Sequence, residues 1–352
     1  MVGGCTVTGE RVTSRRDFLR QAPTALGLLA PGLIASRDER PASGDLIRLG
    51  RRAMGCRFEV ILPAAEAPVE AAREALDLVD DLEQQMTIYR EDSEISAINR
   101  SAARGPVSVE PRLFALLQLA ARLGDETGGA FDITAGPLSR LWREGREPGT
   151  PPAAGEIAAV MSRVGMARVR LDGASQTIAF GRDGVELDLG AIGKGYALDR
   201  VAELLAARGV RAALVHGGQS SVLAIGRPPW DDAWTLDVQH PLRPGETIAA
   251  LRLRDRAMGT SAVGDFSALE GSGRGHLLDP RTGRPAEGPP GATVLAPTAA
   301  EADALATAFC VMCVEETRAY CARHPGVGVL LVPADAEPVV IALGDEEVQV
   351  VR

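Results

Sequence analysis

Apolar residues recur along this chain with two periods, one expected of helices and one of strands. Spacings of three and four residues predict a helix over residues 69–86 and a second helix that opens at Pro111. Because strands and helices do not alternate regularly, the pattern favours an α+β fold. Short aliphatic and β-branched runs predict the strands, at residues 58–62, 185–189, 212–215, 222–225, 234–238 and 327–332, and near Leu251 and Met258.

Glycine and proline mark two further boundaries. Residues 145–155 are rich in both and predict a surface loop. A glycine-rich turn after the 185–189 strand leads into a helix predicted over residues 197–207.

A strongly apolar helix is predicted after Pro297. The segment Thr298-Ala299-Ala300-Glu301 is a capping box that marks its start, and between residues 302 and 314 the only polar side chains besides thiols are Asp303 and Thr307. They are four residues apart and share a face, where two hard oxygen ligands suit Mg²⁺ together with phosphate oxygens. The alternative is a structural Asp paired with an Arg, and a Thr hydroxyl bonded to its own helix.

A second candidate lies in residues 186–197, where glycines punctuate the turn before a helix. Exposed amides in such a turn attract phosphate, although the segment is neither a G-x-G-x-x-G fingerprint nor a Walker A loop. Asp188 ends the predicted strand, and Lys194, the only lysine beside 37 arginines, lies in the loop. Since Lys and Arg are not interchangeable, we favour a functional lysine over a solvated one in an ordinary turn.

Two more segments carry candidate chemistry. The glycine-rich run from Thr127 to Thr134 contains Phe131 and Asp132 and forms either a pocket wall or a plain loop. In the run from 275 to 283, His276 stands near an Asp-Pro turn, where it is either structural or a general base.

Composition and charge narrow the class of protein. Of the 352 residues, 45% are apolar and 24% charged, as in soluble globular proteins. The net charge of −9 argues against a broad basic surface, so we expect no nucleic-acid partner.

Residues 1–36 are predicted to be a twin-arginine signal peptide. Ser14-Arg15-Arg16-Asp17-Phe18-Leu19-Arg20 precedes an apolar stretch that Pro31 and Gly32 make too short and too broken to span a membrane; the alternative is a weak anchor. We therefore expect export to the periplasm or the outer face of the cytoplasmic membrane, peripheral to the membrane at most. Residues 37–45 would be a linker and 46–352 the folded domain.

The spacing of the cysteines does not indicate a metal site. Cys310 and Cys313 have metal-like spacing, but no second pair or nearby His completes a zinc site, so we interpret both as small core residues. A disulfide among Cys56, Cys310, Cys313 and Cys321 stays open.

Together these segments resemble one family, the FAD:protein FMN transferases, or ApbE-like flavin transferases. The resemblance spans roughly residues 46–345 and implies a single α+β domain of two lobes, with mixed or antiparallel sheets, packed helices and the nucleotide between the lobes. The matching pieces keep a shared order: Met54-Gly55, Tyr89-Arg90, Asp92 to Ser96, Gly129 to Asp132, Asp188 to Tyr196, His276 to Gly283 and Ala302 to Thr307.

The resemblance implies that the protein binds FAD with Mg²⁺ and transfers FMN to a Thr or Ser hydroxyl of a partner, forming a phosphoester and releasing AMP. The partner would be an exported redox protein with the acceptor pattern Asp-x-x-(Ser/Thr)-Gly-Ala-(Ser/Thr), which this chain lacks. Alternatives are an FAD pyrophosphatase that yields FMN and AMP, and a non-catalytic periplasmic FAD-binding protein.

The resemblance also assigns roles to single residues. His276 would be the base that deprotonates the acceptor, with Asp303 and Lys194 as the other catalytic residues. Metal ligands would be the main-chain oxygen of Ala191, with Asp303 and Thr307. Cofactor contacts would come from Met54, Tyr89, Ala130, Phe131, Asp132, Asp188, Lys194 and Leu277. One departure stands after His216-Gly217-Gly218, where the family usually has Asn or Asp and then an aliphatic residue, and this chain has Gln219-Ser220-Ser221.

Overall fold

An eight-stranded antiparallel sheet is the centre of the structure, a computed structural model that describes residues 45–66, 68–143, 151–243, 245–262, 277–334, 336–344 and 346–351. Every neighbouring pair of strands in this sheet is antiparallel. In spatial order the strands are β1 (Leu46–Ala53), β2 (Cys56–Pro63), β6 (Ala213–Gly217), β7 (Ser221–Ile225), β10 (Arg256–Ala262), β13 (Gly291–Ala296), β14 (Gly328–Val332) and β15 (Val339–Ile341).

The remaining strands form three smaller sheets. They are β16–β9–β8 (Val348–Val350, Thr247–Leu253, Trp234–Gln239), β3–β5–β4 (Val107–Ser108, Thr177–Phe180, Val169–Asp172) and β11–β12 (Leu278–Asp279, Arg284–Pro285). The α-helices are α2 (Val69–Met86), α3 (Glu94–Ser101), α4 (Pro111–Glu126), α5 (Gly136–Arg143), α6 (Ala154–Met161), α7 (Gly193–Ala207), α8 (Ala299–Phe309) and α9 (Val314–Arg323), with 3₁₀ turns η1 (Ala64–Glu66) and η2 (Met166–Arg168).

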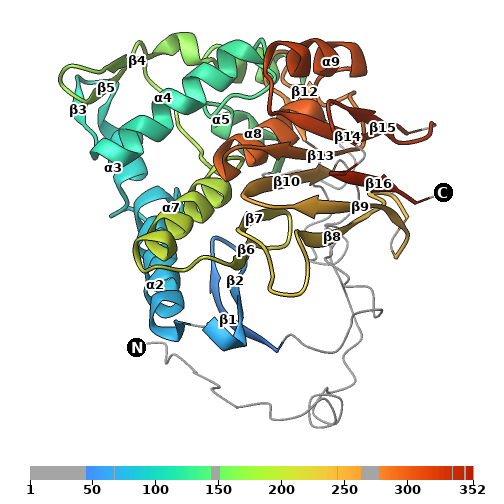
Figure 1. Cartoon of the computed structure of the whole chain (residues 1–352). Coiled ribbons are helices and arrows are strands. Elements are labelled where there is room, and N and C mark those ends of the chain that lie inside the picture. Colours follow the sequence, from blue (N-terminus) through green and yellow to red (C-terminus); the bar gives the residue numbers. More distant parts are fainter. Residues whose placement is uncertain are drawn as a thin grey trace. The chain divides into compact units, whose positions relative to one another are not determined.

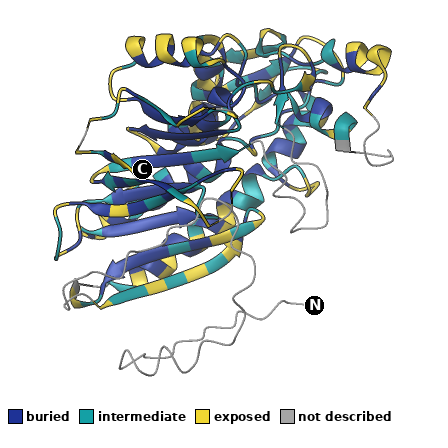
Figure 2. Ribbon diagram, turned by 90° about the vertical axis from the view of Figure 1, so that its right-hand side faces the viewer, coloured by how far each residue is buried: buried dark blue, intermediate teal, exposed yellow. Residues whose placement is uncertain are grey.

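The central sheet is covered on both faces, because successive side chains of a strand point to opposite sides. In β7, Leu223 joins the core beneath helices α2, α7 and α8, whereas Val222 and Ala224 pack against β8 and β9. Figure 1 shows the helices on one side of the sheet and β8, β9 and β16 on the other, and Figure 2 shows the buried central strands between them. Helix α8 lies directly on this sheet, which sets the position of Asp303.

The α+β class and the antiparallel sheet are confirmed, as are the helix over residues 69–86 and the helix that opens at Pro111. The strands predicted at 58–62, 212–215, 222–225, 234–238 and 327–332 match β2, β6, β7, β8 and β14, and those near Leu251 and Met258 match β9 and β10.

The strand predicted at residues 185–189 is wrong. That segment has no strand partner, since Leu187 bonds through both its N–H and its C=O to the side chain of Asn99, at 2.8 and 3.0 Å. The Asp188 amide donates to the carbonyl of Ile133 instead of to a strand. An apolar, extended segment thus satisfies its backbone without a sheet.

Two helix boundaries also differ from expectation. Helix α7 begins at Gly193, so Lys194 lies in its first turn and not in a loop. Helix α6 begins at Ala154, inside the predicted 145–155 loop, of which residues 145–150 lie outside the described residues. The signal peptide and linker, apart from Asp45, also lie outside them.

The apolar stretch after Pro297 forms two helices. Thr298 caps α8 as predicted, accepting a hydrogen bond from the Glu301 amide at 3.2 Å. Cys310 is buried as expected, but Cys313 is exposed and caps α9, so its interpretation as a core residue is wrong. Cys56, Cys310, Cys313 and Cys321 are all free thiols in the structure. Among the described residues, no helix is long and apolar enough to cross a membrane.

Candidate functional site

The first turns of α7 and α8 pack against each other without a side chain between them. A Cβ on Gly195 would lie 2.0 Å from the carbonyl oxygen of Ala299, so only glycine permits this approach. The contact brings the glycine-rich segment and the apolar helix, two of the predicted candidates, together in space.

Asp303 is the polar centre of this contact and is only 4% exposed. Its Oδ2 accepts a hydrogen bond from the Gly195 amide at 3.1 Å, and its Oδ1 accepts one from the Ser221 hydroxyl at 2.8 Å. The Lys194 Nζ lies 3.5 Å from Oδ1. The carboxylate is therefore paired with the single lysine of the chain, and not with an arginine as the structural alternative had it.

The Ala191 carbonyl stands just before the N-cap of α7. Gly195 is the third residue of this helix, and the first amides of a helix have no carbonyl partner within it. The Gly195 amide donates to Asp303, and no described residue donates to the Ala191 carbonyl oxygen. An acceptor oxygen without a described protein donor therefore lies just before the helix whose third amide bonds to Asp303.

Thr307 lies one turn beyond Asp303 on α8. Its hydroxyl is 3.2 Å from the Ser261 hydroxyl on β10 and 3.5 Å from the Asp303 carbonyl oxygen, a long contact to its own helix. No group of three or more His, Cys, Asp or Glu side chains within the described ranges could hold a metal ion. A cation here would depend on one carboxylate with carbonyl and hydroxyl oxygens, and this hard donor set fits Mg²⁺ that keeps water or phosphate ligands.

The turn between β1 and β2 borders the same place. Met54 and Gly55 have φ of 50° and 72°, as in a two-residue type I′ hairpin, and the Met54 amide donates to Glu83 Oε1 of α2 at 2.7 Å. Cys56 follows the turn, half-buried; burial raises the pKa of its thiol to about 11, against the lowering effect of the Lys194 charge. The charges of Asp303 and Glu83 also raise it.

Tyr89 follows α2 and is the most exposed of the large apolar side chains among the described residues, at 81%. Its amide donates to the Thr87 hydroxyl at 3.2 Å, which fixes the backbone while the ring stays open to solvent. A large exposed aromatic side chain is suited to stacking on a ligand ring.

The run from Thr127 to Thr134 is a buried turn. Ala130 and Phe131 are 1% and 2% exposed and belong to the core, so their side chains face no open surface. Asp132 accepts hydrogen bonds from the Thr134 amide and hydroxyl at 2.7 and 2.6 Å and from the Met166 amide at 3.2 Å, and burial raises its pKa. This turn contacts the second candidate segment through the Ile133–Asp188 hydrogen bond at 2.7 Å.

Asp188 and Leu277 lie at the edges of this arrangement. Asp188 Oδ1 accepts from the Gly190 amide at 2.9 Å, which shapes the turn toward α7. Leu277 is half-buried and precedes the turn in which Arg281 pairs with Asp279 at 3.0 Å. A Cβ on Gly129 would lie 3.6 Å from Arg281 Cγ, so the third and fourth candidate segments are neighbours. His276, the predicted base, lies outside the described residues.

A second, half-buried carboxylate anchors the start of helix α8. Asp199 of α7 accepts hydrogen bonds from the Ala299 and Ala300 amides at 2.7 and 2.9 Å. Burial raises the pKa of Asp199 to about 6 despite these bonds. Asp199 thus fixes the end of the helix that positions Asp303.

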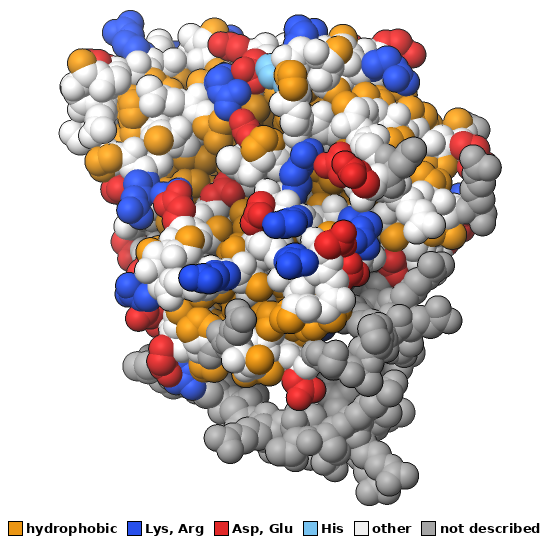
Figure 3. All heavy atoms as spheres, viewed as in Figure 1, with side chains coloured by type: hydrophobic (Ala, Val, Ile, Leu, Met, Phe, Trp, Pro, Cys, Tyr) orange, Lys and Arg blue, Asp and Glu red, His pale blue; other side chains and the backbone are white. Residues whose placement is uncertain are grey.

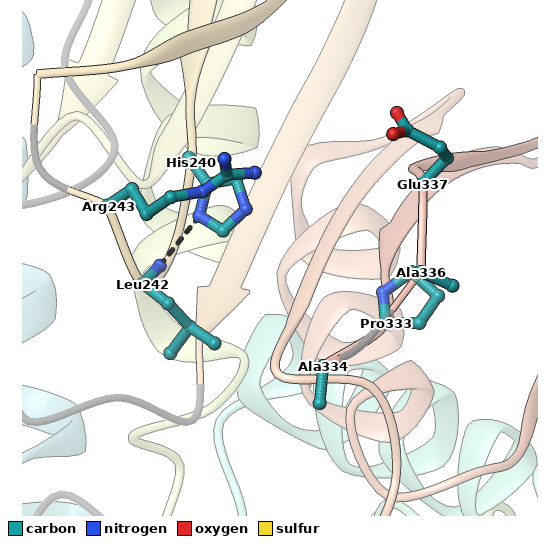
Figure 4. Close-up of a pocket in the computed structure, with 7 residues that line it drawn as sticks. All are labelled: His240, Leu242, Arg243, Pro333, Ala334, Ala336 and Glu337. Carbon is teal, nitrogen blue, oxygen red and sulfur yellow. Dashed lines mark hydrogen bonds between the residues drawn. The ribbon is translucent and has the colours of Figure 1, made fainter.

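Two open cavities lie elsewhere. One of about 570 Å³ is lined by the segments after β8 and β14, where His240 Nδ1 accepts from the Leu242 amide at 3.0 Å and burial lowers the His240 pKa (Figure 4). The other, of about 400 Å³, lies between α2 and α7 and is lined by Tyr196 and Arg200. Neither includes Asp303 or Lys194. On the face shown in Figure 3, acidic and basic side chains are mixed.

Sequence reasoning missed three contributors, Ser221, Cys56 and Glu83. Ser221 and Cys56 follow Gly-containing turns, but nothing in the apolar pattern places them beside Asp303. Glu83 is one of several acidic residues on the polar side of an amphipathic helix, and only its bond to Met54 distinguishes it.

The ApbE family model matches residues 54–331 of this chain. A protein of Treponema pallidum (strain Nichols) named FAD:protein FMN transferase is 31% identical over 297 residues, 80% of this chain and 82% of that protein. One of the same name from Klebsiella pneumoniae (strain 342) is 30% identical over 330 residues, 91% of this chain and 93% of that protein.

Solved structures agree with these matches. The flavin transferase ApbE from Vibrio cholerae has a TM-score of 0.74 at 25% identity, covering 85% of this chain and 98% of that one. The ApbE protein from Thermotoga maritima has a TM-score of 0.73 at 27% identity, covering 84% and 97%.

Proposed function

This chain belongs to the ApbE family, and on that premise we propose that it is an FAD:protein FMN transferase. It takes FAD as substrate and passes FMN to a Thr or Ser hydroxyl of a partner protein. The acceptor oxygen attacks the phosphorus on the FMN side of the pyrophosphate. A phosphoester bond forms, the phosphorus–oxygen bond to the AMP portion breaks, and AMP leaves with the electron pair of that bond.

The observation that carries this proposal is the meeting of Lys194, the Gly195 amide and Asp303 at the start of α7. Phosphoryl transfer depends on positioning and on offsetting negative charge, more than on covalent chemistry by the protein. A lysine beside a buried carboxylate, at the amino-terminal end of a helix, supplies that combination.

Each candidate site residue then has a role in the reaction. Lys194 offsets charge on the pyrophosphate as AMP leaves, and Met54 and Tyr89 hold the flavin end. The residues suited to Mg²⁺ are Asp303, Thr307 and the Ala191 carbonyl. When bound, the ion would neutralise phosphate charge. His276 is our candidate for the base that accepts the proton of the acceptor hydroxyl.

The remaining nucleotide contacts in this proposal come from the neighbouring turns. Ala130 to Asp132, Asp188 and Leu277 border the nucleotide. The side chains of Ala130 and Phe131 are buried, so their contribution would be through the backbone.

We also propose where the reaction takes place. The twin-arginine pattern at Ser14 to Arg20 supports export, and the acceptor would be an exported redox protein with the Asp-x-x-(Ser/Thr)-Gly-Ala-(Ser/Thr) pattern. Fusion of residues 1–44 to a reporter that is active only after export in a folded state tests the predicted export signal. Replacing Arg15 and Arg16 by Lys should abolish the reporter activity.

The central experiment is incubation of the purified protein with FAD, Mg²⁺ and an acceptor domain carrying this pattern. AMP release and a flavin mass adduct on the acceptor are expected together, with no adduct when the acceptor hydroxyl is removed. Asp303→Asn should abolish both, whereas the surface variant Asp77→Asn, at a carboxylate that is 65% exposed, should not.

Two other outcomes would contradict the transferase. AMP without an adduct on any acceptor indicates an FAD pyrophosphatase. FAD that stays bound and intact in Mg²⁺ indicates a flavin carrier.

A further inference from the structure

Ser221 is the only side-chain hydroxyl that bonds to the Asp303 carboxylate in the described part of the chain. The Ser221 residue is 0% exposed, and its Oγ donates to Asp303 Oδ1 at 2.8 Å. A fully buried hydroxyl with a charged acceptor is a strong interaction, because a hydrogen bond to an ionised group is shorter and stronger than a neutral one.

The sheet is built to allow this contact. Ser221 opens β7 and stands opposite Gly217 of β6 on one side and Gly259 of β10 on the other. A Cβ on Gly259 would lie 2.2 Å from the Ala302 carbonyl oxygen, so α8 rests on the bare backbone of β10. Two glycines thus flank the serine, and the residue before Asp303 sits directly on one of them.

Between β2 and β14, the same cross-strand row is otherwise apolar. It continues through Phe58 beyond Gly217, and through Val294 and Val329 beyond Gly259, all of them in the core beneath the helices. Ser221 is the one polar side chain among these buried positions. A hydroxyl placed here without a partner would cost free energy, so its bond to Asp303 explains why it can be there.

The hydroxyl also determines which part of the carboxylate stays available. A carboxylate offers about four lone-pair sites. The Gly195 amide bonds to Oδ2 and Ser221 bonds to Oδ1, each from a fixed backbone or strand position. The Lys194 side chain is longer, 23% exposed and more distant, with its Nζ 3.5 Å from Oδ1. The two closer donors therefore hold the plane of the carboxylate and leave its other lone pairs for Lys194 and a cation.

We propose that Ser221 is a positioning residue, which holds the Asp303 carboxylate in the orientation that binds the cation of the flavin-transfer site. The inference rests on the proposed function and deepens it, since it names a residue that acts through Asp303. Hydrogen bonds from such outer residues to a ligating carboxylate typically change metal affinity by about 10-fold to 100-fold.

The test compares Ser221→Ala with the wild-type protein by direct metal binding. Mn²⁺ is titrated in the presence of ADP as a diphosphate, and free Mn²⁺ is followed by electron paramagnetic resonance. We expect the Kd for Mn²⁺ to rise by about tenfold or more in Ser221→Ala. The Mg²⁺ concentration that half-activates AMP release should rise in parallel, while the affinity for FAD in EDTA stays unchanged.

A matched control removes a different buried hydroxyl of the same sheet. Thr293 of β13 is 3% exposed and accepts from the Thr260 hydroxyl at 3.2 Å, and among the described contacts it makes no hydrogen bond to Asp303. Thr293→Val should leave the Mn²⁺ affinity unchanged. If Ser221→Ala does not fold, Ser221→Cys keeps a donor at this position, a thiol that is larger than the hydroxyl and donates more weakly, and it should give an intermediate Kd.

The outcomes separate this inference from the proposed function. An unchanged Kd for Mn²⁺ in a folded Ser221→Ala protein overturns the positioning role, even if flavin transfer is intact. A raised Kd without any flavin transfer by the wild type upholds the positioning role and overturns the transferase. Wild-type protein that binds no Mn²⁺ overturns the positioning role as well.

Discussion

The Gly195 amide nitrogen lies 3.1 Å from Asp303 Oδ2, although 108 residues separate them in the chain. Gly195 is the third residue of α7, so its amide has no carbonyl partner within that helix. The bond joins the start of α7 to the second turn of α8, next to Lys194, and among the described residues nothing donates to the Ala191 carbonyl just before α7. The position of the candidate site follows from this one contact.

Replacement of Gly195 by Ala should separate α7 from α8. Its Cβ would meet the Ala299 carbonyl at 2.0 Å, and overpacking of this kind costs about 1–3 kcal/mol. We expect a lower free energy of unfolding in urea and loss of AMP release. Gly155→Ala is the control, because a Cβ there has no atom within 4 Å; a loss of stability in that variant would show that the effect is not one of packing.

Tyr89→Ala should weaken FAD binding without destabilising the fold. The side chain is 81% exposed, so its removal should leave the melting temperature nearly unchanged. Loss of aromatic stacking should weaken the binding free energy of FAD by about 1–3 kcal/mol, which raises its KM by about tenfold. Tyr89→Phe should restore KM. Leu242→Ala, at another exposed apolar residue, should not alter it; equal effects of both variants would contradict a specific flavin contact.

FAD with Mg²⁺ should protect Cys56 from a small thiol-methylating reagent. Cys56 is half-buried and its thiol feels the charges of Lys194 and Asp303, whereas Cys313 is exposed at the N-cap of α9 and provides an internal control within the same molecule. Because the Cys56 pKa is raised to about 11, its labelling should quicken about tenfold per pH unit through the neutral range. Mass spectrometry of both peptides measures the rates, and equal protection of Cys313 would rule out a local effect.

The pair of the half-buried Glu59 and the buried His216 should make stability depend on acid pH. Their side chains approach to 3.1 Å, and the His216 hydrogen bond, with Arg57, lowers the Glu59 pKa from 4.5 to about 2. A lowered folded pKa contributes stability that is fully present above about pH 4.5 and is lost as the pH falls toward 2. At neutral pH it amounts to about 3 kcal/mol.

Glu59→Gln removes this dependence. Urea unfolding at several pH values should show the wild type more stable at pH 7, with the difference shrinking between pH 4.5 and 2. A difference that stays constant over that range would mean that the carboxylate charge is not responsible.

Part of the site could be predicted because its signals are local. An aspartate in an otherwise apolar helix needs a hydrogen-bonding or charged partner, because burying an unpaired carboxylate is costly. The Thr298 cap fixes where that helix begins. A lone lysine within a glycine-rich turn likewise stands out in the sequence. These local signals identify Asp303, Thr307 and Lys194 as candidate site residues from the sequence.

Other parts depend on register and could not be predicted. Ser221 reaches Asp303 only because Gly217 and Gly259 stand opposite it. The apolar pattern does not determine which residues of neighbouring strands are paired. The error at residues 185–189 has a similar origin, since extended apolar residues look alike whether a strand or the Asn99 side chain satisfies their backbone.

The long sequence separations around Asp303 bear on the order of folding. Its partners Gly195 and Ser221 lie 108 and 82 residues away, so no short fragment of the chain contains the arrangement. Contacts of this span close late in folding, because distant segments lose much entropy when they meet. Tight binding of cation or nucleotide at Asp303 would therefore report a completed fold, and an export route that accepts folded chains would carry the site already assembled.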